Sequence, residues 1–386
     1  MFQPAKRLGD VQEYYFSRKL REIKAMEAAG RRVINLGIGS PDLPPAPEVI
    51  EELHYQSKID RHHAYQSYNG IAELRNAFAS WYKSHFGVEL DPSTEILPLI
   101  GSKEGIMHVS MTYLETGDEV LIPNPGYPAY RAVANLTGAS IVNYDLIAAN
   151  QWLPNLEALA DSDLSKVKLM WVSYPNMPTG SGASLAFFEE LVRFAYDHHI
   201  LICNDNPYSF VLNDERLSIL RVEGSKEVVL ELNSLSKSHN MAGWRIGMLA
   251  GKSDYLQAVL RFKSNMDSGM FKPIQLAAAK ALQLDAQWYQ DLNEIYRKRR
   301  EKVYELLNIL GCTYDSQQVG MFVWAKIPNF YQSGYELSDK VLEETGVFIT
   351  PGSIFGTNGE HYIRISLCSP VAEFQEAIDQ VNKMKH

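Results

Sequence analysis

Lys237 lies at the centre of a group of side chains that could hold a phosphate next to an amine. Ser234 and Ser236 precede it, and Arg245 follows within a Gly-x-Arg-x-Gly segment. A lysine amine can condense with an aldehyde to form a Schiff base, and a nearby cation or a dry pocket makes it more nucleophilic by lowering its pKa. The serine hydroxyls and the guanidinium are donors for an anion. Pyridoxal phosphate carries both an aldehyde and a phosphate, so the group predicts this cofactor. The alternative is a solvated lysine in a surface loop.

Two apolar runs flank this group and must position it. Residues 228–232 have the composition of a β-strand, and residues 246–250 form a second apolar run. A lysine held between two core strands differs from an ordinary surface lysine, but a short motif stays a hypothesis until its structural context agrees. The rest of the chain supplies that context.

The stretch 231–251 closely resembles the lysine signature of the class I and II aminotransferases, a family of fold-type I pyridoxal phosphate enzymes. In that family Ser-x-Ser-Lys is followed by Gly-x-Arg-x-Gly. The resemblance extends over nearly the whole chain, and residues 263–271 are similar to the corresponding loop of the diaminopimelate-type branch. It implies that Lys237 carries the cofactor as a Schiff base and that the two serines and the arginine hold its phosphate.

A small-residue turn after an apolar strand offers a second part of the phosphate site. Residues 96–100 form the predicted strand, and Gly101, Ser102 and Lys103 open a helix that continues through 106–114. Backbone N–H groups at a helix start form an anion site where a glycine allows close approach. The same turn is also the ordinary connection between a strand and a helix. Its weight comes from its agreement with the group around Lys237.

The resemblance also assigns residues to the pyridine ring of the cofactor. Tyr127, in a proline-rich loop after a strand, matches the aromatic ring that stacks on the pyridine. Asp205, after the apolar run 199–203, matches the carboxylate that keeps the pyridine nitrogen protonated, which makes the ring an electron sink. Tyr208 matches the residue that hydrogen-bonds the phenolic oxygen. Packed turns are the alternative, because Asn-Asp-Asn-Pro forms turns by itself.

The sequence departs from the family at Met177. The family pattern is Asn-Pro-Thr-Gly, with an asparagine that hydrogen-bonds the phenolic oxygen, and this chain has Met-Pro-Thr-Gly from Met177 to Gly180. A thioether cannot replace an amide donor. Either the preceding Asn176 takes over this role, or the phenolic oxygen has one partner fewer. Asn176 is therefore kept as a predicted cofactor residue.

The family resemblance assigns three further residues, two of them to the substrate and one to a partner subunit. Arg364, in the alternating run 362–367, matches the arginine that clamps the α-carboxylate of the substrate through two parallel hydrogen bonds. Gly39 matches a glycine that lets the backbone approach the substrate. Tyr65 matches a tyrosine that reaches into the neighbouring subunit and donates to the phosphate, which implies a homodimer with shared active sites. A solvated strand face, a plain turn and an exposed tyrosine are the ordinary alternatives.

The chain has 386 residues, which exceeds the usual limit for a single core. Short apolar runs alternate with helical segments from about residue 95 to 285, which predicts an α/β fold with a largely parallel sheet. The resemblance implies a large domain with a mostly parallel sheet flanked by helices and a smaller α+β domain. We expect residues 1–44 to form an N-terminal arm and part of the small domain. Residues 45–285 are expected to form the large cofactor-binding domain, and residues 286–386 the C-terminal small domain.

Charge and cysteine usage exclude several classes of partner. The net charge of −9 and the lack of a concentrated basic run argue against nucleic acid and anionic membrane. Cys203, Cys312 and Cys368 have no metal-ligand spacing and are expected to be reduced thiols, so no metal is predicted. The sequence has neither a run of ~18 apolar residues nor a secretory signal pattern, and a cytoplasmic location is expected.

These assignments predict an aminotransferase that moves the α-amino group of an L-amino acid to a 2-oxo acid in a ping-pong sequence, with Lys237 as the base. The alternative enzyme is a C–S or β-eliminating lyase, which uses the same lysine and phosphate site. A cofactor-binding regulatory domain is disfavoured because no basic helix-turn-helix extension is found, and a nucleotide-binding α/β protein because no Gly-x-Gly-x-x-Gly or Walker-type loop is found. The donor side chain stays open among aspartate, alanine, aromatic residues, methionine and diaminopimelate.

Overall fold

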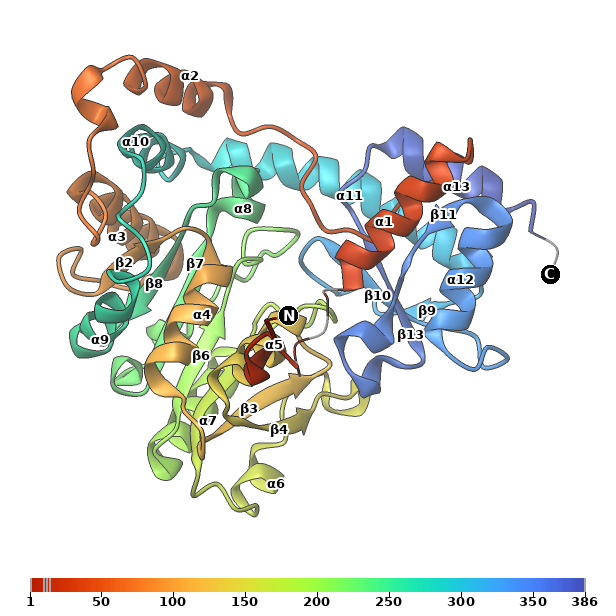
Figure 1. Ribbon diagram of the computed structural model, residues 1–386. Helices are drawn as coiled ribbons and strands as arrows, with labels where there is room; N and C mark the ends of the chain where they lie inside the picture. Colours follow the sequence, from red (N-terminus) through yellow and green to blue (C-terminus); the bar gives the residue numbers. More distant parts are fainter. Residues whose placement is uncertain (1, 10, 12, 14, 385–386) are drawn as a thin grey trace.

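A computed structural model of the chain describes residues 2–9, 11, 13 and 15–384, and its fold is shown in Figure 1. Across these residues, seven strands form a central sheet in the order β2-β8-β7-β6-β5-β3-β4. Strand β8 runs antiparallel to both of its neighbours, and the other neighbouring strands are parallel. The strands of this sheet are β2 (Ile96–Leu99), β3 (Glu119–Asn124), β4 (Ser140–Asp145), β5 (Val167–Val172), β6 (Leu201–Asp205), β7 (Val229–Ser234) and β8 (Gly247–Gly251).

Helices cover both faces of this sheet, which is why its central strands are apolar on both sides. In β5, Met170 and Val172 pack into one core, and Leu169 and Trp171 pack into the other, as the two-residue period of a strand requires. The first core includes α3 (Ala72–Phe86), α7 (Leu185–His198) and α10 (Lys272–Ala281), and the second includes α4 (Ser102–Tyr113), α5 (Pro128–Thr137) and α9 (Ser253–Lys263). The predicted α/β fold with a mostly parallel sheet flanked by helices is confirmed.

The C-terminal part holds a smaller antiparallel sheet with a core of its own, in the order β12-β13-β10-β9. In addition, β1 (Ile34–Asn35) pairs in parallel with β11 (Val347–Phe348), so an N-terminal segment joins this part. Figure 1 shows α11 running from the large sheet to the small one. The remaining elements of this part are α1 (Tyr15–Ala28), α11 (Ala286–Ile309), β9 (Thr313–Tyr314), β10 (Phe322–Lys326), α12 (Gly334–Thr345), β12 (Thr350–Pro351), β13 (Tyr362–Ser366) and α13 (Val371–Val381).

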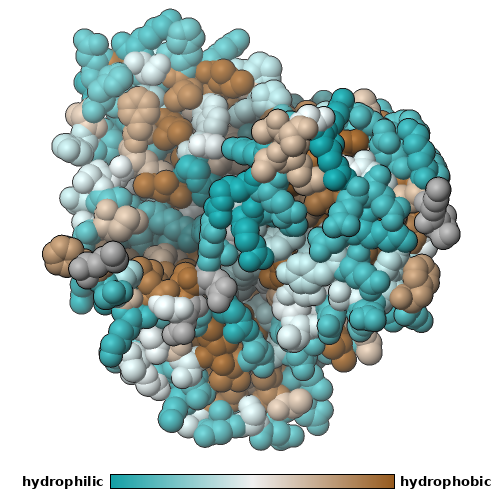
Figure 2. Space-filling model, turned by 45° about the vertical axis from the view of Figure 1, so that its right-hand side comes forward, coloured by the Kyte–Doolittle hydropathy of each residue, from teal (hydrophilic) through white to brown (hydrophobic). Residues whose placement is uncertain are grey.

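The other α-helices of the described residues are α2 (Pro47–Gln56), α6 (Leu156–Ala160) and α8 (Leu235–Ser238). The domain bounds at residues 44 and 285 stay a prediction. Within the part of the chain that the structure describes, no helix combines the length and apolarity needed to cross a membrane. The face drawn in Figure 2 is mostly hydrophilic, with hydrophobic side chains gathered in patches between polar ones.

A buried carboxylate joins two strands that carry predicted site residues. Glu231 of β7 is fully buried, and its Oε1 accepts hydrogen bonds from Tyr82 Oη (2.9 Å) and Ser218 Oγ (2.7 Å). Its Oε2 accepts from Asn204 Nδ2 (2.9 Å) and from the backbone N–H of Ile219 (3.2 Å). Because Asn204 lies next to the last residue of β6, the carboxylate ties the end of β6 to β7. It thereby fixes the relative positions of the segments that follow these two strands.

Replacing Glu231 by methionine should lower the free energy of unfolding by at least about 3 kcal/mol, because buried donors left without an acceptor cost roughly 1–3 kcal/mol each. Glu231→Gln should cost less. Its amide NH₂ can face the hydroxyls of Tyr82 and Ser218, which can turn to accept, while its carbonyl oxygen still accepts from Asn204 and Ile219. Urea denaturation measures both losses. A loss for E231Q as large as that for E231M would contradict this account.

Candidate active site

A cavity of about 280 Å³ lies between the two sheets, at the carboxyl ends of β5, β6 and β7. Open α/β sheets bind ligands at this edge. The structure brings together there most of the residues that the sequence predicts for the site. These are Gly39, Ser102, Lys103, Tyr127, Asp205, Tyr208, Ser234, Ser236, Lys237, Arg245 and Arg364.

Lys237 enters the cavity from α8, the short helix that directly follows β7. The helix begins at this point because Ser234, at the end of the strand, caps it and accepts a hydrogen bond from the backbone N–H of Ser236 (3.2 Å). The Lys237 ammonium donates to the carbonyl oxygen of Gly39 at 2.7 Å. This contact joins the large sheet to the segment that follows β1.

The surroundings of Lys237 disfavour its charged form. Burial is the largest effect and lowers the pKa of Lys237 to about 8. Cys368 opposes this shift, and the charges of Arg364 and Arg245 contribute to it. The neutral amine, which is the form that attacks a carbonyl, is therefore far more abundant near neutral pH than it is for a solvated lysine.

Asp205 ends β6 and places a buried carboxylate at the floor of the cavity. Its Oδ2 accepts a hydrogen bond from Tyr130 Oη at 3.0 Å, and its Oδ1 has no hydrogen-bond partner among the residues that the structure describes. Burial raises the pKa of Asp205 to about 6, and the Tyr130 hydrogen bond opposes this rise. A buried carboxylate oxygen that lines a cavity without a partner is suited to a cationic N–H donor from a ligand.

A cationic, donor-rich surface lies at the start of α4. Ser102 is the first residue of that helix, where free backbone N–H groups favour an anion. Gly101 before it has φ +82°, and a Cβ atom there would lie 2.0 Å from Arg245 Nη2. The missing side chain thus lets the guanidinium rest against the helix start. Partial burial of the Lys103 amine and the charge of Arg245 lower the pKa of Lys103, whose side chain lines the cavity.

Arg364 of β13 faces the cavity from the small sheet. It is 3% exposed, and its Nη2 donates to the carbonyl oxygen of Gly37 at 2.9 Å. Its guanidinium carbon lies 3.9 Å from the ring centroid of Phe322, 4.6 Å from that of Phe355 and 5.5 Å from that of Phe16. Cation–π contacts hold the planar fork in place. The arginine is therefore oriented before any carboxylate arrives.

Met177 lies where the family has an asparagine, and it lines the cavity. Its sulfur is 3.3 Å from Arg364 Nη1. Asn176 does not line the cavity with it. Its Oδ1 accepts from Thr179 Oγ1 (2.8 Å) and its Nδ2 donates to the carbonyl oxygen of Ser173 (3.2 Å), so its amide holds the turn together. The cofactor role predicted for Asn176 gains no support from this geometry.

Tyr65 also lies away from the cavity. Its side chain is 91% exposed, so it does not contact the site of its own chain. A role for Tyr65 at a phosphate would need a second subunit, as predicted from the resemblance.

Several residues that complete the site were not predicted from the sequence. Tyr130 is the buried partner of Asp205 and stacks on Trp171 at 5.0 Å between ring centroids. It lies one helical turn after the predicted Tyr127, which is the one sequence pattern that pointed to it. The rings of Phe16, Phe322 and Phe355 around the guanidinium come from three distant parts of the chain, and no local pattern marks them.

The residues around this cavity fit pyridoxal phosphate. Lys237 offers an amine with a lowered pKa, and Asp205 offers to a protonated ring nitrogen an oxygen that no described residue hydrogen-bonds. The start of α4 and Arg245 offer donors for a phosphate, with a glycine that keeps the two in contact. These groups lie on different sides of one cavity, as the separate ends of the cofactor require.

Nearly the whole chain is similar to known proteins. The family described as aminotransferase class I and II matches residues 31–381. An LL-diaminopimelate aminotransferase of Dehalococcoides mccartyi is 42% identical over 376 residues, which cover 97% of this chain and 97% of that protein. An LL-diaminopimelate aminotransferase of Moorella thermoacetica is 39% identical, covering 99% of this chain and 98% of that protein. A solved structure of BacF from Bacillus subtilis has a TM-score of 0.95 and 35% identity, covering 99% of this chain and 98% of that one.

The lowered pKa of Lys237 predicts how the cofactor-free protein reacts with a small amine reagent. Acetylation of Lys237 by trace acetic anhydride should rise with pH to a midpoint near 8, because only the neutral amine reacts. The exposed Lys83 serves as the internal control, since its ion pair with Glu89 raises its pKa. Peptide mass spectrometry after timed labelling gives both profiles. A midpoint for Lys237 at about 10 or above, the range of a solvated lysine, would contradict the account.

Proposed function

The chain belongs to the aminotransferase class I and II family, and from this premise we propose its amino donor, the roles of its site residues and the assembly in which they work. The protein is an aminotransferase that depends on pyridoxal phosphate. The observation that carries the residue roles is the position of Lys237. Its amine, with a pKa of about 8, lies in one cavity with the carboxylate of Asp205 and the guanidinium of Arg364.

Each end of the cofactor has a proposed holder in this cavity. Lys237 would bind its aldehyde carbon covalently, and Asp205 would pair with its ring nitrogen. Tyr127 would stack on the ring, and Tyr208 would hydrogen-bond the phenolic oxygen. The phosphate would lie among Gly101, Ser102, Lys103, Ser234, Ser236 and Arg245, which surround the start of α4.

When bound, pyridoxal phosphate supplies an electron sink for the bond that breaks at the substrate α-carbon. The chain supplies position and proton transfer. Arg364 binds the substrate carboxylate with two parallel N–H donors, an arrangement that a guanidinium offers and an ammonium does not. The amine of Lys237, once released, takes the α-proton on its Nζ, for which a pKa near the working pH is well suited.

We propose LL-diaminopimelate as the donor, with a 2-oxo acid as the acceptor. The support is the name of two relatives at 42% and 39% identity over nearly the full chain. A second candidate is an aromatic L-amino acid, because Phe16, Phe322 and Phe355 line the cavity around Arg364. The comparisons give no support to the lyase alternative.

The proposed assembly is a homodimer in which Tyr65 of each chain reaches the phosphate site of the other. Tyr65 is 91% exposed, and Lys103 and Arg245 are exposed as well, so both the proposed donor and the phosphate site are open in the single chain. The cytoplasm is the proposed location, supported by three cysteines that are buried free thiols.

A panel of donors tests the proposed substrate. With 2-oxoglutarate as acceptor, LL-diaminopimelate should give a kcat/KM at least about tenfold above those of phenylalanine, alanine and aspartate, since correct pairing of a distal polar group is worth about that factor. The Lys237→Ala variant should transfer no amino group from any of them. A higher kcat/KM for phenylalanine would replace the first candidate by the second. Near-normal transfer by K237A would refute the assigned lysine.

A further inference from the structure

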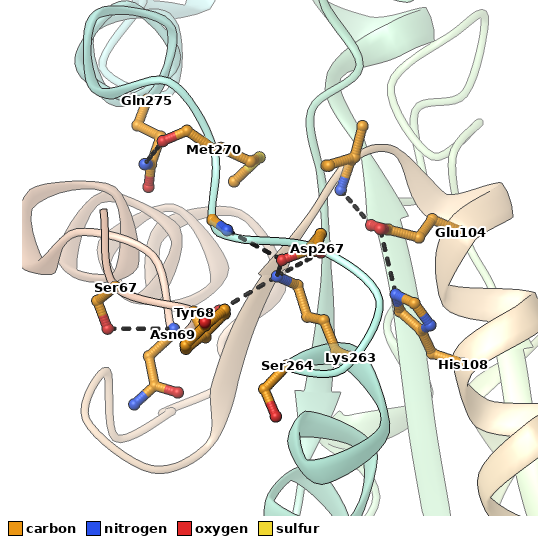
Figure 3. Close-up of polar contacts among 12 residues, drawn as sticks. Ser67, Tyr68, Asn69, Glu104, His108, Lys263, Ser264, Asp267, Met270 and Gln275 are labelled. Atoms are coloured by element: carbon orange, nitrogen blue, oxygen red, sulfur yellow. Dashed lines mark hydrogen bonds and ion pairs between the residues drawn. The ribbon is translucent and has the colours of Figure 1, made fainter. Parts of the chain in front are cut away.

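A buried lysine outside the active site ties together two exposed loops. Lys263, the last residue of α9, is 1% exposed, and its Nζ lies 2.9 Å from both carboxylate oxygens of Asp267. The same ammonium donates to the backbone carbonyl oxygen of Tyr68 at 3.2 Å, as Figure 3 shows. One buried cation therefore binds the loop after α9 and the loop before α3.

Other contacts hold the same two loops against each other. The backbone N–H of Gly269 donates to Asp267 Oδ1 at 3.0 Å, and a Cβ atom on Gly269 would lie 2.7 Å from the carbonyl oxygen of Gln66. The fully buried Gln275 of α10 accepts from the backbone N–H of Ile71 at 2.9 Å and donates to the carbonyl oxygen of Met270 at 2.6 Å. The backbones of residues 66–71 and 267–270 thus form one unit.

Exposed large apolar side chains lie in this unit and directly beside it in the chain. Tyr65 is 91% exposed, Tyr68 44%, Met266 53% and Phe271 44%. A group of large apolar side chains that is fixed from within but open to water is typical of an interface with another protein. The partner that fits the proposed function is a second copy of this chain, which would receive Tyr65.

The unit also contacts the helix that carries the proposed phosphate site. On α4, His108 is fully buried, and its Nε2 lies 3.2 Å from Glu104 Oε1. One ring nitrogen of His108 and one carboxylate oxygen each of Glu104 and Asp267 lie within 4.8 Å of one another, so the three side chains have a spacing that could suit a metal. The ammonium of Lys263 already supplies a positive charge to the Asp267 carboxylate, and a metal there would have to lie beside it.

We propose that Lys263 is a positioning residue that acts on the active site of the other subunit. Its buried ion pair with Asp267 fixes the two loops, so that Tyr65 is presented to the partner in one conformation. In an isologous dimer the two chains make the same contacts, so each chain places this unit at the active site of the other. The inference rests on the proposed function, in particular on the homodimer and on the role of Tyr65 at the phosphate.

The first test compares cofactor affinity in variants of the full chain. Lys263→Met and Tyr65→Phe should each raise the Kd of pyridoxal phosphate about tenfold in absorption titrations, the loss expected for one hydrogen bond to a charged group. The Lys252→Met control removes an exposed ion pair with Glu227 at the other end of α9 and should leave the Kd unchanged. Adding K263M to Y65F should change the Kd by less than about twofold, because the lysine acts through the tyrosine. If the increases in Kd of the two single variants instead multiply in the double variant, the proposal is overturned.

The second test separates an effect on the partner from a general loss of structure. A hybrid dimer is purified from a K263M chain and a K237A chain that carry different tags. Only the K263M chain has Lys237, so the absorption band of the lysine-bound cofactor comes from its active site alone. The Tyr65 that reaches this active site belongs to the K237A chain, in which Lys263 is intact. The Kd of the hybrid should therefore return to the wild-type value. A Kd as weak as that of the K263M homodimer would overturn the proposal.

Removing one partner of a buried ion pair can unfold a protein. Should K263M not fold, the Lys263→Met, Asp267→Asn double variant leaves no unpaired charge in the pair and takes its place in both tests. Sedimentation velocity and Tyr65→Phe alone test the underlying function. A monomeric wild type, or a Y65F variant with normal affinity, would refute the proposed assembly. If Y65F binds pyridoxal phosphate more weakly and K263M binds it normally, the role of Lys263 is refuted and the proposed assembly stands.

Discussion

The site depends on an amine that is kept buried among other cations. Burial lowers the pKa of Lys237 to about 8, and Arg364 and Arg245 act in the same direction. These arginines line the same cavity as the lysine and are the proposed anchors for two anions, the substrate carboxylate and the cofactor phosphate. The proposed anchors for the reacting molecules thus also contribute to the shift in the lysine pKa, whose largest cause is burial.

This arrangement needs both sheets, and one short segment connects them. The carbonyl oxygen of Gly37 accepts from Arg364 of the small sheet, and that of Gly39 accepts from Lys237 of the large sheet. A Cβ atom on Gly39 would lie 2.2 Å from the ring of Phe322, so there is no room for a side chain at this position. The distance between the amine and the carboxylate clamp is therefore set by the packing of the segment between the sheets. Substitutions at these glycines would act on the chemistry through position.

Local patterns in the sequence predicted the parts of the fold that are apolar throughout, because continuous apolar runs mark strands buried on both faces. The runs around β5, β6, β7 and β8 were found in this way, and the residues that follow them reach one cavity. Strand β4 was not predicted, since it lies at the edge of the sheet and most of its side chains are partly exposed. The aromatic rings around Arg364 and the contact between Lys263 and Tyr68 could not be predicted, because each contact joins residues far apart in the chain. The hydrogen bonds of Asn176 are local, but which way an amide turns depends on the surrounding packing.

The central claim is that Lys237 is the residue that holds the cofactor. The most direct measurement is to load the protein with pyridoxal phosphate, reduce it with borohydride and locate the added mass by peptide sequencing in a mass spectrometer. The account predicts one modified peptide, with the pyridoxyl group on Lys237 and none on Lys103, which lies across the same cavity. Modification of Lys103, or of surface lysines without preference for Lys237, would contradict it.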